Sequence, residues 1–381
     1  MILVLRALGV GDLATAVPAL RGLRAAFPGH TLSIAAPDWL TPLAELIGDV
    51  DNVIPANGLD PVHWAGPAPY WAVNLHGRGP QSHQLLDSAD PERLCAFECA
   101  EAGHLDGPQW RHDEHEVHRW CRLLSWYGVR ADPDDLDLRR PAPRRVPVGV
   151  TVLHPGGKGT ARRWSPGRFA SLARELARTG HRVVVTGSSD ERDLAERVVA
   201  GAGLPNTAVL AGRLDLLELA AVVAHARLVV STDTGIAHLA TAYRAPSVVL
   251  FGPVRPELWG PPPDRPWHRA LHATLTGPTS ADAETNSTRV HPAVTAGPAS
   301  EGAGGDWARI HPAVTAGPAS EGAGGDWARI HPAVTAGPAS EGAGGDWAGI
   351  HPALAAIEVD EVLTVAGEVE RAGRSCGAAT T

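Results

Sequence analysis

The stretch RLVVSTDTGIAHLATAYRAPSVVLFGP, residues 227–253, holds side chains and a turn that could bind a phosphorylated ligand. A buried-type strand is expected to end at Asp233, and a helix to begin at Thr234–Gly235. The free N–H groups at a helix N-terminus bind phosphate, and Gly235 would let a ligand approach the backbone. His238 follows one turn into the helix and is expected to face the same opening. Ordinary capping by Asp233 and Thr234 explains the pattern equally well.

A second candidate is the glycine-rich stretch HPGGKGTARRWSPGRF, residues 154–169, which contains Lys158, the only lysine of the chain. Together with Arg162 and Arg163, this lysine could neutralise a diphosphate. The glycine spacing does not match a Walker A loop. The alternative interpretation is a solvated basic loop with no ligand.

The third candidate is Asp12 in LGVGD, residues 8–12, which we expect at the end of the first strand. A carboxylate there could act as a general base, although it could also cap the following helix. Gly9 and Gly11 are followed by Ala14, so the third glycine of a dinucleotide-binding fingerprint is missing. The motif therefore argues against an enzyme that uses NAD.

A rival metal site lies in residues 95–121, where cysteines and histidines gather. Its spacing Cys-x3-Cys, with histidines nearby, could bind zinc. However, His112, His115 and His118 step by three along an expected helix beside acidic residues, which is typical of a solvated helix face. We favour that second interpretation, and we find no Asp-x-Asp metal pair at an expected strand end.

The elements that would position these residues alternate between strand and helix. In the first part, strands are expected at 1–8, 31–37, 52–56 and 71–77, and helices at 13–27, 39–48 and 113–128. After a Pro- and Arg-rich linker near 137–147, strands are expected at 148–154, 181–187, 227–233 and 246–253, and helices at 165–180, 190–203, 216–226 and 234–244. Such alternation predicts parallel sheets with crossover helices. Two Rossmann-like domains would face each other across a cleft, with ligands at the carboxyl ends of the strands.

A tandem repeat interrupts this pattern near the C-terminus. HPAVTAGPASEGAGGDWARI fills 291–310 and recurs at 311–330, and a third copy at 331–350 differs only in having Gly349 in place of arginine. Six of the 20 positions are glycine or proline, and the apolar residues follow no helical or strand period, which favours a disordered insertion. A binding array is the alternative. The partial fourth copy runs directly into an expected helix, so we expect the repeat to be a loop expanded inside an older domain.

Composition narrows the class of protein. A net charge of −9 without a basic block argues against nucleic-acid binding. No run approaches the ~18 apolar residues of a membrane span, and the N-terminus lacks the charged region of a signal peptide. Four cysteines do not form a disulfide framework. We therefore expect a cytoplasmic protein, with peripheral membrane contact left open.

Taken together, the motifs resemble glycosyltransferase family 9, the ADP-heptose:lipopolysaccharide heptosyltransferases and their relatives. The matching stretches begin with LRALGVGDLATAVPALRGLRAAFP, HPGGKGTARRWSPGRFASLA and VVVTGSSDERDLAE, and end with STDTGIAHLATAYRAPSVVLFGP followed by WGPP. They occur in family order over nearly all of 1–275, and IEVDEVL resembles the last helix of the family. Arg162 stands where the family usually has lysine, and Thr232 where it often has asparagine.

The resemblance implies a GT-B fold and an inverting, metal-independent transfer of a sugar, a heptose or similar, from a nucleoside-diphosphate donor. The acceptor would be a hydroxyl of a glycan or glycolipid, as in the biosynthesis of lipopolysaccharide or another cell-surface glycan, and no cofactor would be needed. The domains implied are an acceptor-side domain, 1–142, a donor-binding domain, 148–288, the repeat insertion, 289–350, and a C-terminal helix completing the fold, 351–372.

The resemblance also implies roles for single residues. Asp12 would be the catalytic base, and Arg162, helped by Lys158, would bind the donor diphosphate. Glu191 would bind the ribose and Asp233 the donor sugar, while Thr234 and Gly235 would offer N–H groups to the phosphates with His238 nearby. Two other classes stay open at this point, a nucleotide-sugar-binding scaffold that uses the repeat for interaction and an epimerase of similar fold. Neither the donor nor the acceptor follows from the sequence.

The repeat generates a first prediction. We expect a variant that lacks 291–350, three whole periods, to remain folded and active, because the deletion joins Val290 to His351 and HPA opens every copy. Loop closure depends weakly on length, by about 0.6 kcal/mol per doubling. The melting temperature and the activity of the variant check this. A fall of more than a few degrees, or a loss of activity, would show that the repeat packs or binds.

Overall fold

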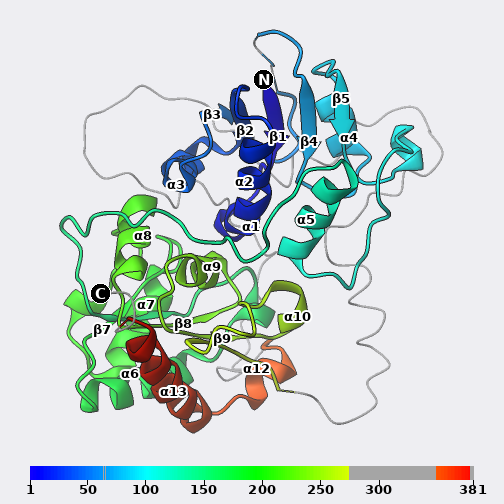
Figure 1. Cartoon of the computed structure of the whole chain (residues 1–381). Coiled ribbons are helices and arrows are strands. Elements are labelled where there is room, and N and C mark those ends of the chain that lie inside the picture. The colour runs from blue at the N-terminus through cyan, green and yellow to red at the C-terminus, as the bar shows by residue number, and fades with distance from the viewer. Residues whose placement is uncertain (63, 65, 274–348, 378–381) are drawn as a thin grey trace, which may run out of the picture.

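The computed structural model of the chain describes residues 1–62, 64, 66–273 and 349–377. The predicted repeat insertion, 289–350, lies outside the described residues except for Gly349 and Ile350. Figure 1 shows two α/β units, one containing the N-terminus and the other the C-terminal helices. In the described part of the chain, no helix combines the length and the apolar character that crossing a membrane requires.

The first unit is built on a five-stranded parallel sheet in the order β3-β2-β1-β4-β5. Its strands are β1 (Ile2–Leu5), β2 (Leu32–Ala36), β3 (Asn52–Pro55), β4 (Trp71–Asn74) and β5 (Arg93–Cys95). The central strand β1 is fully buried because its apolar run pairs on both sides, with Ile2 opposite Leu32 of β2 and Trp71 of β4. The chain therefore leaves β1 toward the middle of the carboxyl edge of the sheet.

The second unit repeats this plan with the order β10-β9-β8-β6-β7. Its strands are β6 (Thr151–His154), β7 (Val183–Val185), β8 (Leu228–Thr232), β9 (Ser247–Leu250) and β10 (His268–Leu271). All pairs are parallel, and the central strand β8 pairs with both β6 and β9. The sequence-based prediction of two parallel sheets is therefore confirmed, although β5 and β10 were not predicted.

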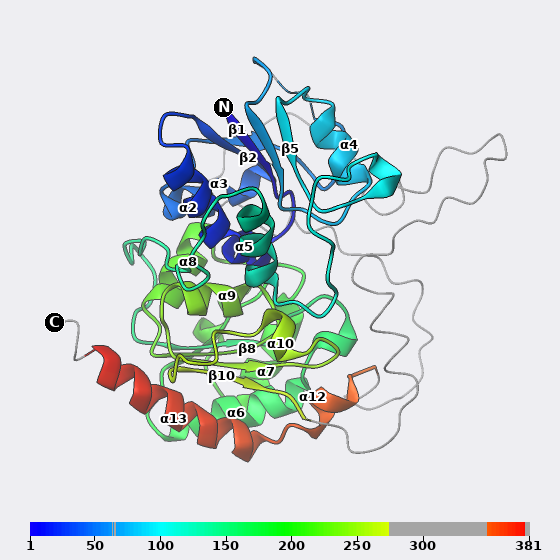
Figure 2. The same ribbon diagram turned by 45° about the vertical axis from the view of Figure 1, so that its right-hand side comes forward.

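Helices cover both faces of each sheet. In the first unit they are α1 (Val10–Thr15), α2 (Val17–Ala26), α3 (Thr41–Ile47), α4 (Gln81–Asp87) and α5 (Glu116–Trp126). In the second they are α6 (Pro166–Arg178), α7 (Arg192–Ala202), α8 (Leu216–Ala224), α9 (Gly235–Ala242), α10 (Pro256–Trp259), α12 (Pro352–Ala356) and α13 (Val359–Gly377). Figure 2 shows α8 and α9 on the side of the second sheet that faces the first unit, and α6 and α13 on the other side.

Two predicted helices are broken in the structure. The helix expected at 13–27 is two helices, because α1 ends at Thr15 and α2 starts anew at Val17 with Pro18 in its first turn, where the missing N–H costs nothing. The C-terminal helix expected at 351–372 is also divided, and its second part continues to Gly377. Ser165 caps α6, since its hydroxyl accepts the N–H of Arg168 at 3.4 Å.

One buried apolar cluster spans both units and fixes how they meet. It joins residues of α1 and α2, such as Leu13 and Val17, to residues of α8 and α9, such as Leu219, Ile236 and Leu239, all of them at most 5% exposed. Burying these side chains from both units together favours a single arrangement of the two sheets. As a result, the loops after β1 and β8 lie at the same junction.

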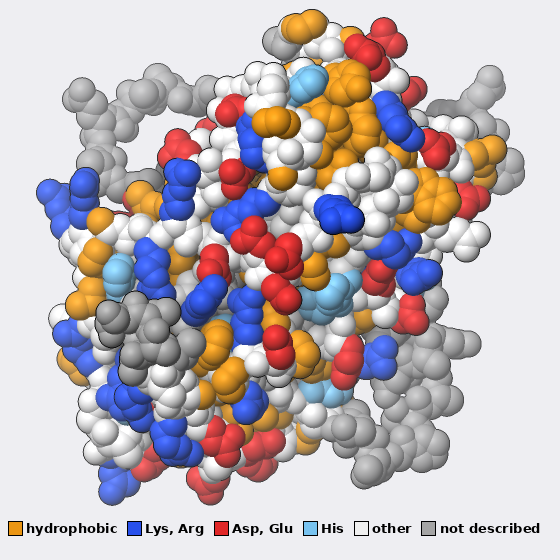
Figure 3. Space-filling view, in the orientation of Figure 1, with side chains coloured by type: hydrophobic (Ala, Val, Ile, Leu, Met, Phe, Trp, Pro, Cys, Tyr) orange, Lys and Arg blue, Asp and Glu red, His pale blue; other side chains and the backbone are white. Residues whose placement is uncertain are grey.

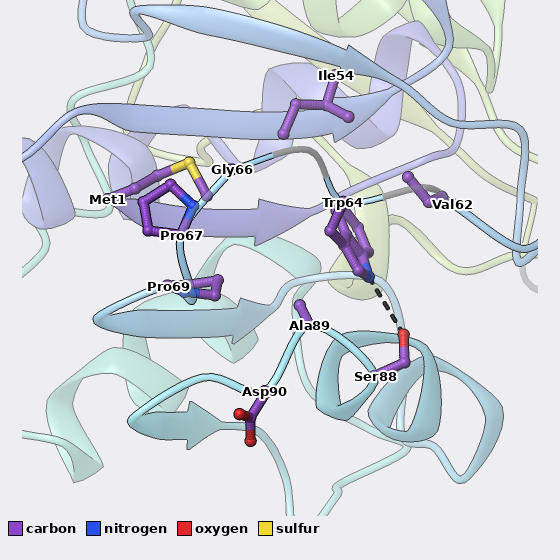
Figure 4. A pocket seen from close by; sticks show the side chains of 10 residues that line it. All are labelled: Met1, Ile54, Val62, Trp64, Gly66, Pro67, Pro69, Ser88, Ala89 and Asp90. Carbon is purple, nitrogen blue, oxygen red and sulfur yellow. Dashed lines mark hydrogen bonds between the residues drawn. The ribbon is translucent and has the colours of Figure 1, made fainter.

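A separate cavity of about 270 Å³ lies in the first unit, at the opposite end of β1 from the junction. Figure 4 shows its largely apolar lining, with Met1 and Ile54 on one side and the indole N–H of Trp64 donating to the hydroxyl of Ser88 at 3.2 Å. Met1 precedes β1 whereas Asp12 follows it, so this cavity and Asp12 are at different ends of the sheet.

Candidate active site

The candidate site is the place where the first turns of α1 and α9 touch. A Cβ on Gly235 would lie 2.8 Å from the Cβ of Val10, and a Cβ on Gly11 would lie 2.8 Å from Cδ2 of His238. Both distances are too short for real side chains, so the two glycines are needed for the helices to approach. The missing side chain of Gly235 makes room for α1, and its predicted contact with a ligand stays a prediction.

Asp12 lies in the first turn of α1 and not at the end of β1, as the sequence suggested. Its Oδ2 accepts the backbone N–H of Gly9 at 3.0 Å, so the carboxylate does help to cap the helix. Its Oδ1 lies 3.5 Å from the guanidinium of Arg6, and 29% of the side chain stays exposed. Asp12 is thus both anchored and accessible, as a proton acceptor needs to be.

Arg6 is the main residue of the site that the sequence analysis missed. It is only 1% exposed, and its guanidinium donates to the carbonyl of Asp12 at 2.9 Å, the hydroxyl of Thr15 at 3.2 Å and the carboxylate of Glu116 at 2.9 Å. It also lies over the ring of Trp120, 4.7 Å from the centroid. A charged residue after a buried apolar run was the available signal, since a buried charge must be paired.

Asp233 and Arg162 form the second-unit side of the site. Their side chains are 3.7 Å apart, with Asp233 11% exposed and Arg162 40% exposed. Burial raises the pKa of Asp233 to about 6, Arg162 opposes that shift, and the negative charge of Asp12 adds to it. The carboxylates of Asp12 and Asp233, which belong to different units, therefore repel each other electrostatically across the junction.

Glu191 organises the glycine-rich loop after β6. Its Oε1 accepts the N–H of Gly157 and its Oε2 that of Ser188, both at 2.9 Å, while Arg163 lies 3.9 Å away. Burial alone would raise the pKa of Glu191, but His154 and the two N–H donors outweigh burial, so the pKa is lowered. Glu191 is thus an ionised brace of this loop before any ligand is considered.

The remaining candidates differ in their surroundings. Thr234 is the N-cap residue of α9, and its hydroxyl donates to the carbonyl of Thr232 at 3.3 Å. Thr232 in turn donates to the carbonyl of Gly156 at 2.7 Å, which ties β8 to the glycine-rich loop. Lys158 is exposed and makes no ion pair with any residue that the structure describes.

His238 is half-buried and points toward the first unit. It packs edge-on against Trp259 of α10, with ring centroids 5.7 Å apart, and it lines a cavity of about 20 Å³ together with Thr15 and His115. Burial lowers the pKa of His238 to about 4, although Asp12 opposes the shift. The imidazole is therefore neutral at neutral pH, and it fills the junction without adding a charge.

The rival zinc site is not assembled. Burial raises the pKa of the Cys95 and Cys121 thiols to about 12, and His115 caps α5 and contacts the carbonyl of Gly260 at 3.0 Å. Within the described ranges, no three His, Cys, Asp or Glu side chains gather as metal ligands.

Acidic and basic side chains are interspersed over the face in Figure 3 and form no broad basic surface there.

Comparison with known proteins shows that the chain is similar to heptosyltransferases. The family described as "Glycosyltransferase family 9 (heptosyltransferase)" matches residues 111–290. Lipopolysaccharide heptosyltransferase 2 of Salmonella typhimurium is 25% identical over 308 residues, which cover 68% of this chain and 85% of that protein. Lipopolysaccharide heptosyltransferase 1 of Pseudomonas aeruginosa is 40% identical over 154 residues, which cover 39% of this chain and 42% of that protein.

Solved structures resemble the fold over most of both chains. The ADP-heptose lipopolysaccharide heptosyltransferase II of Escherichia coli aligns with a TM-score of 0.59 and 22% identity, covering 72% of this chain and 91% of that one. A heptosyltransferase of the same organism, solved with ADP, aligns with a TM-score of 0.55 and 19% identity, covering 71% and 92%. The arrangement of two parallel-sheet units is thus the one found in these enzymes.

The raised pKa of Asp233 predicts a pH-dependent stability. An aspartate whose pKa is higher in the folded protein stabilises the fold below its unfolded pKa, near 3.9, and this contribution is lost as the pH rises through about 6. We therefore expect Asp233→Asn to match the wild type near pH 4 and to be more stable above pH 6.5, by up to about 3 kcal/mol.

Denaturant unfolding of both proteins at several pH values measures this difference. Asp360→Asn, which removes an exposed acid of α13, is the matched control for the loss of a carboxylate. A difference for Asp233→Asn that does not change between pH 4 and pH 7.5 would contradict a buried, raised-pKa carboxylate.

Proposed function

Because this chain is a heptosyltransferase-like glycosyltransferase of family 9 with a GT-B fold, we propose that it inverts the anomeric carbon as it transfers a heptose or similar sugar. The donor is a nucleoside-diphosphate sugar, with ADP as the nucleotide. The acceptor is a hydroxyl of lipopolysaccharide or a similar cell-surface glycolipid. The names of the relatives, which are ADP-heptose and lipopolysaccharide heptosyltransferases, support this choice of donor and acceptor. A cytoplasmic location and peripheral contact with the membrane that holds the acceptor belong to the same proposal.

The observation that carries the proposal is the meeting of Asp12 with Asp233 and Arg162 at the junction of the units. Asp12 belongs to the first unit, and the other two belong to the second. The accessible carboxylate of Asp12 is close enough to raise the pKa of the buried Asp233, and Asp233 is in turn paired with the cation Arg162. A displacement needs such an arrangement, because the base and the leaving group act on opposite sides of the reacting carbon.

In the proposed reaction, Asp12 takes the proton of the acceptor hydroxyl as that oxygen attacks the anomeric carbon. The new carbon–oxygen bond forms while the bond from the carbon to the diphosphate oxygen breaks. A sugar hydroxyl is a poor nucleophile until its proton is removed, so a positioned base is essential. Arg6 holds the backbone and the carboxylate of Asp12 in place for this step.

The leaving diphosphate gains negative charge, and the second unit supplies the groups that stabilise it. Arg162 is half-exposed and near the start of α9, where Thr234 and Gly235 offer backbone N–H groups. Lys158 is exposed and unpaired among the described residues, so it can turn toward the phosphates. These cations do the work that a metal ion does in other transferases, which makes the proposed mechanism metal-independent.

Asp233 and Glu191 complete the proposed donor site. Apart from the Arg162 ion pair, the Asp233 carboxylate accepts no hydrogen bond from the described residues, so it can accept hydroxyl groups of the donor sugar. Glu191 already braces the glycine-rich loop through two N–H groups, and its remaining acceptor positions can bind the ribose hydroxyls. His238 contributes shape rather than charge.

The proposed base generates a direct prediction. We expect Asp12→Asn to reduce transfer by 10²–10⁴-fold while ADP binding stays unchanged, because asparagine keeps the size and the acceptor for Gly9 N–H but takes up no proton. Initial rates and ADP titration calorimetry measure the two effects. If Asp12 served only to cap α1, asparagine would replace it with little loss, and a rate within about threefold of wild type would support that alternative.

The donor site generates a second prediction. Arg162→Ala should weaken ADP binding, because Arg162 faces the diphosphate, whereas Asp233→Ala should lower turnover and leave ADP affinity closer to wild type. Arg178→Ala, an arginine 73% exposed on α6, serves as the control for loss of a positive charge. Equal losses of ADP affinity in Arg162→Ala and Asp233→Ala would reject this division of roles.

A further inference from the structure

The chain re-enters the described structure at Gly349, in direct contact with the loop that carries Arg162. We call this loop, which connects β6 to α6, the donor loop. It contains a short 3-10 helix, Thr160–Arg162. A Cβ on Gly349 would lie 2.8 Å from the hydroxyl oxygen of Thr160. The last residues of the third repeat copy therefore pack against the proposed diphosphate site.

Gly349 is required there for two separate reasons. Its φ is +85°, in the region that residues with a Cβ rarely adopt. A Cβ would also crowd the hydroxyl of Thr160, which would have to turn away. Any other residue at 349 must therefore strain its backbone and also displace Thr160 or move away from the donor loop.

The residues that follow Gly349 form further contacts with the end of the donor loop and the start of α6. The indole N–H of Trp164 donates to the carbonyl of Ile357 at 3.1 Å, and Arg168 donates to the carbonyl of Ala355 at 2.8 Å. Arg168 also pairs with Glu358 at 2.6 Å. Leu354 and the carbonyl of Ala161 both adjoin Gly252, so α12 lies beside the donor loop. These bonds hold the chain after Arg162, and the packing of Gly349 on Thr160 adjoins the chain before it.

The other side of the donor loop faces the site. Arg162 reaches Asp233, and Arg163 donates to the carbonyl of Gly157 at 3.0 Å. We propose that Gly349 is a positioning residue for the donor site, because it lets the segment 349–358 brace the donor loop that presents Arg162. This inference rests on the proposed function in one respect, namely that Arg162 binds a nucleoside diphosphate.

The repeat sequence gives this brace a second consequence. The residue pair before each HPA is Arg289–Val290, Arg309–Ile310, Arg329–Ile330 and, last, Gly349–Ile350. Ile350, which packs against the core of the second unit, and Ala353, which is buried, have identical or similar counterparts in every copy. Only the final copy carries the glycine that the contact with Thr160 requires. Gly349 thus selects which of the similar segments docks on the donor loop.

The test is a single substitution that makes the third copy identical to the other two. In Gly349→Arg we expect faster hydrogen–deuterium exchange in peptides covering 158–168 and an ADP dissociation constant raised by up to about tenfold. Arg329→Gly, the same position one copy earlier, is the matched control and should leave both quantities unchanged. Far-ultraviolet circular dichroism and the melting temperature establish that each variant is folded.

Two deletions of equal length provide a test without a bulky substitution. Removing 289–348 joins Thr288 to Gly349 and keeps the glycine, whereas removing 291–350 joins Val290 to His351 and places Arg289 at its position. We expect the first deletion to bind ADP like the full chain and the second to bind it more weakly. The expected loss of ADP affinity revises the prediction from the sequence that the variant lacking 291–350 keeps full activity.

The two readouts separate the inference from the proposed function. If the wild type does not bind ADP, the proposed donor is wrong, and hydrogen exchange of 158–168 still decides whether Gly349 braces the loop. Unchanged exchange in a folded Gly349→Arg protein would overturn the inference. Faster exchange with an ADP affinity within twofold of wild type would overturn it too, because the brace would then not act on the donor site.

Discussion

The contact between the first turns of α1 and α9 is the constraint on which the site depends. Gly11 and Gly235 have no side chains, so two helices that follow the central strands of different sheets can meet backbone to backbone. This approach brings Asp12 close enough to Asp233 to influence its ionisation. The buried guanidinium of Arg6 lies beside the Asp12 carboxylate and offsets its negative charge. A side chain at Gly11 or Gly235 would push the two helices apart and move Asp12 away from Asp233.

Most of the fold follows from local sequence signals. Buried apolar runs and helical periodicity predicted eight of the ten strands that the described residues form, and two parallel sheets with them. The edge strands β5 and β10 were missed, because both are short and only partly buried. Pro18, which indicates a kink or a false start in the sequence, lies in the first turn of α2 just after the break. At such points tertiary pairing decides the structure, and a single sequence does not record that pairing.

The site was predicted as a list of residues but not as a geometry. The chemical character of Asp12, Arg162 and Asp233 identified them, whereas their mutual distances depend on how the two units pack. For the same reason the packing role of Gly235, which makes room for Val10, was not predicted. In the sequence, Gly349 is only the single difference between the third repeat copy and the first two. Only the φ of +85° and the nearby Thr160 give that residue a physical reason.

The most direct test of this account is the titration of Asp233 with and without the charge of Asp12. Carboxyl ¹³C NMR of selectively labelled aspartate can follow Asp233 in the wild type and in Asp12→Asn, with Asp233→Asn used to assign the signal. The account predicts a midpoint near pH 6 in the wild type and a lower midpoint once the neighbouring charge is removed. An identical midpoint in both proteins would show that the two carboxylates do not share one site, and would contradict the account.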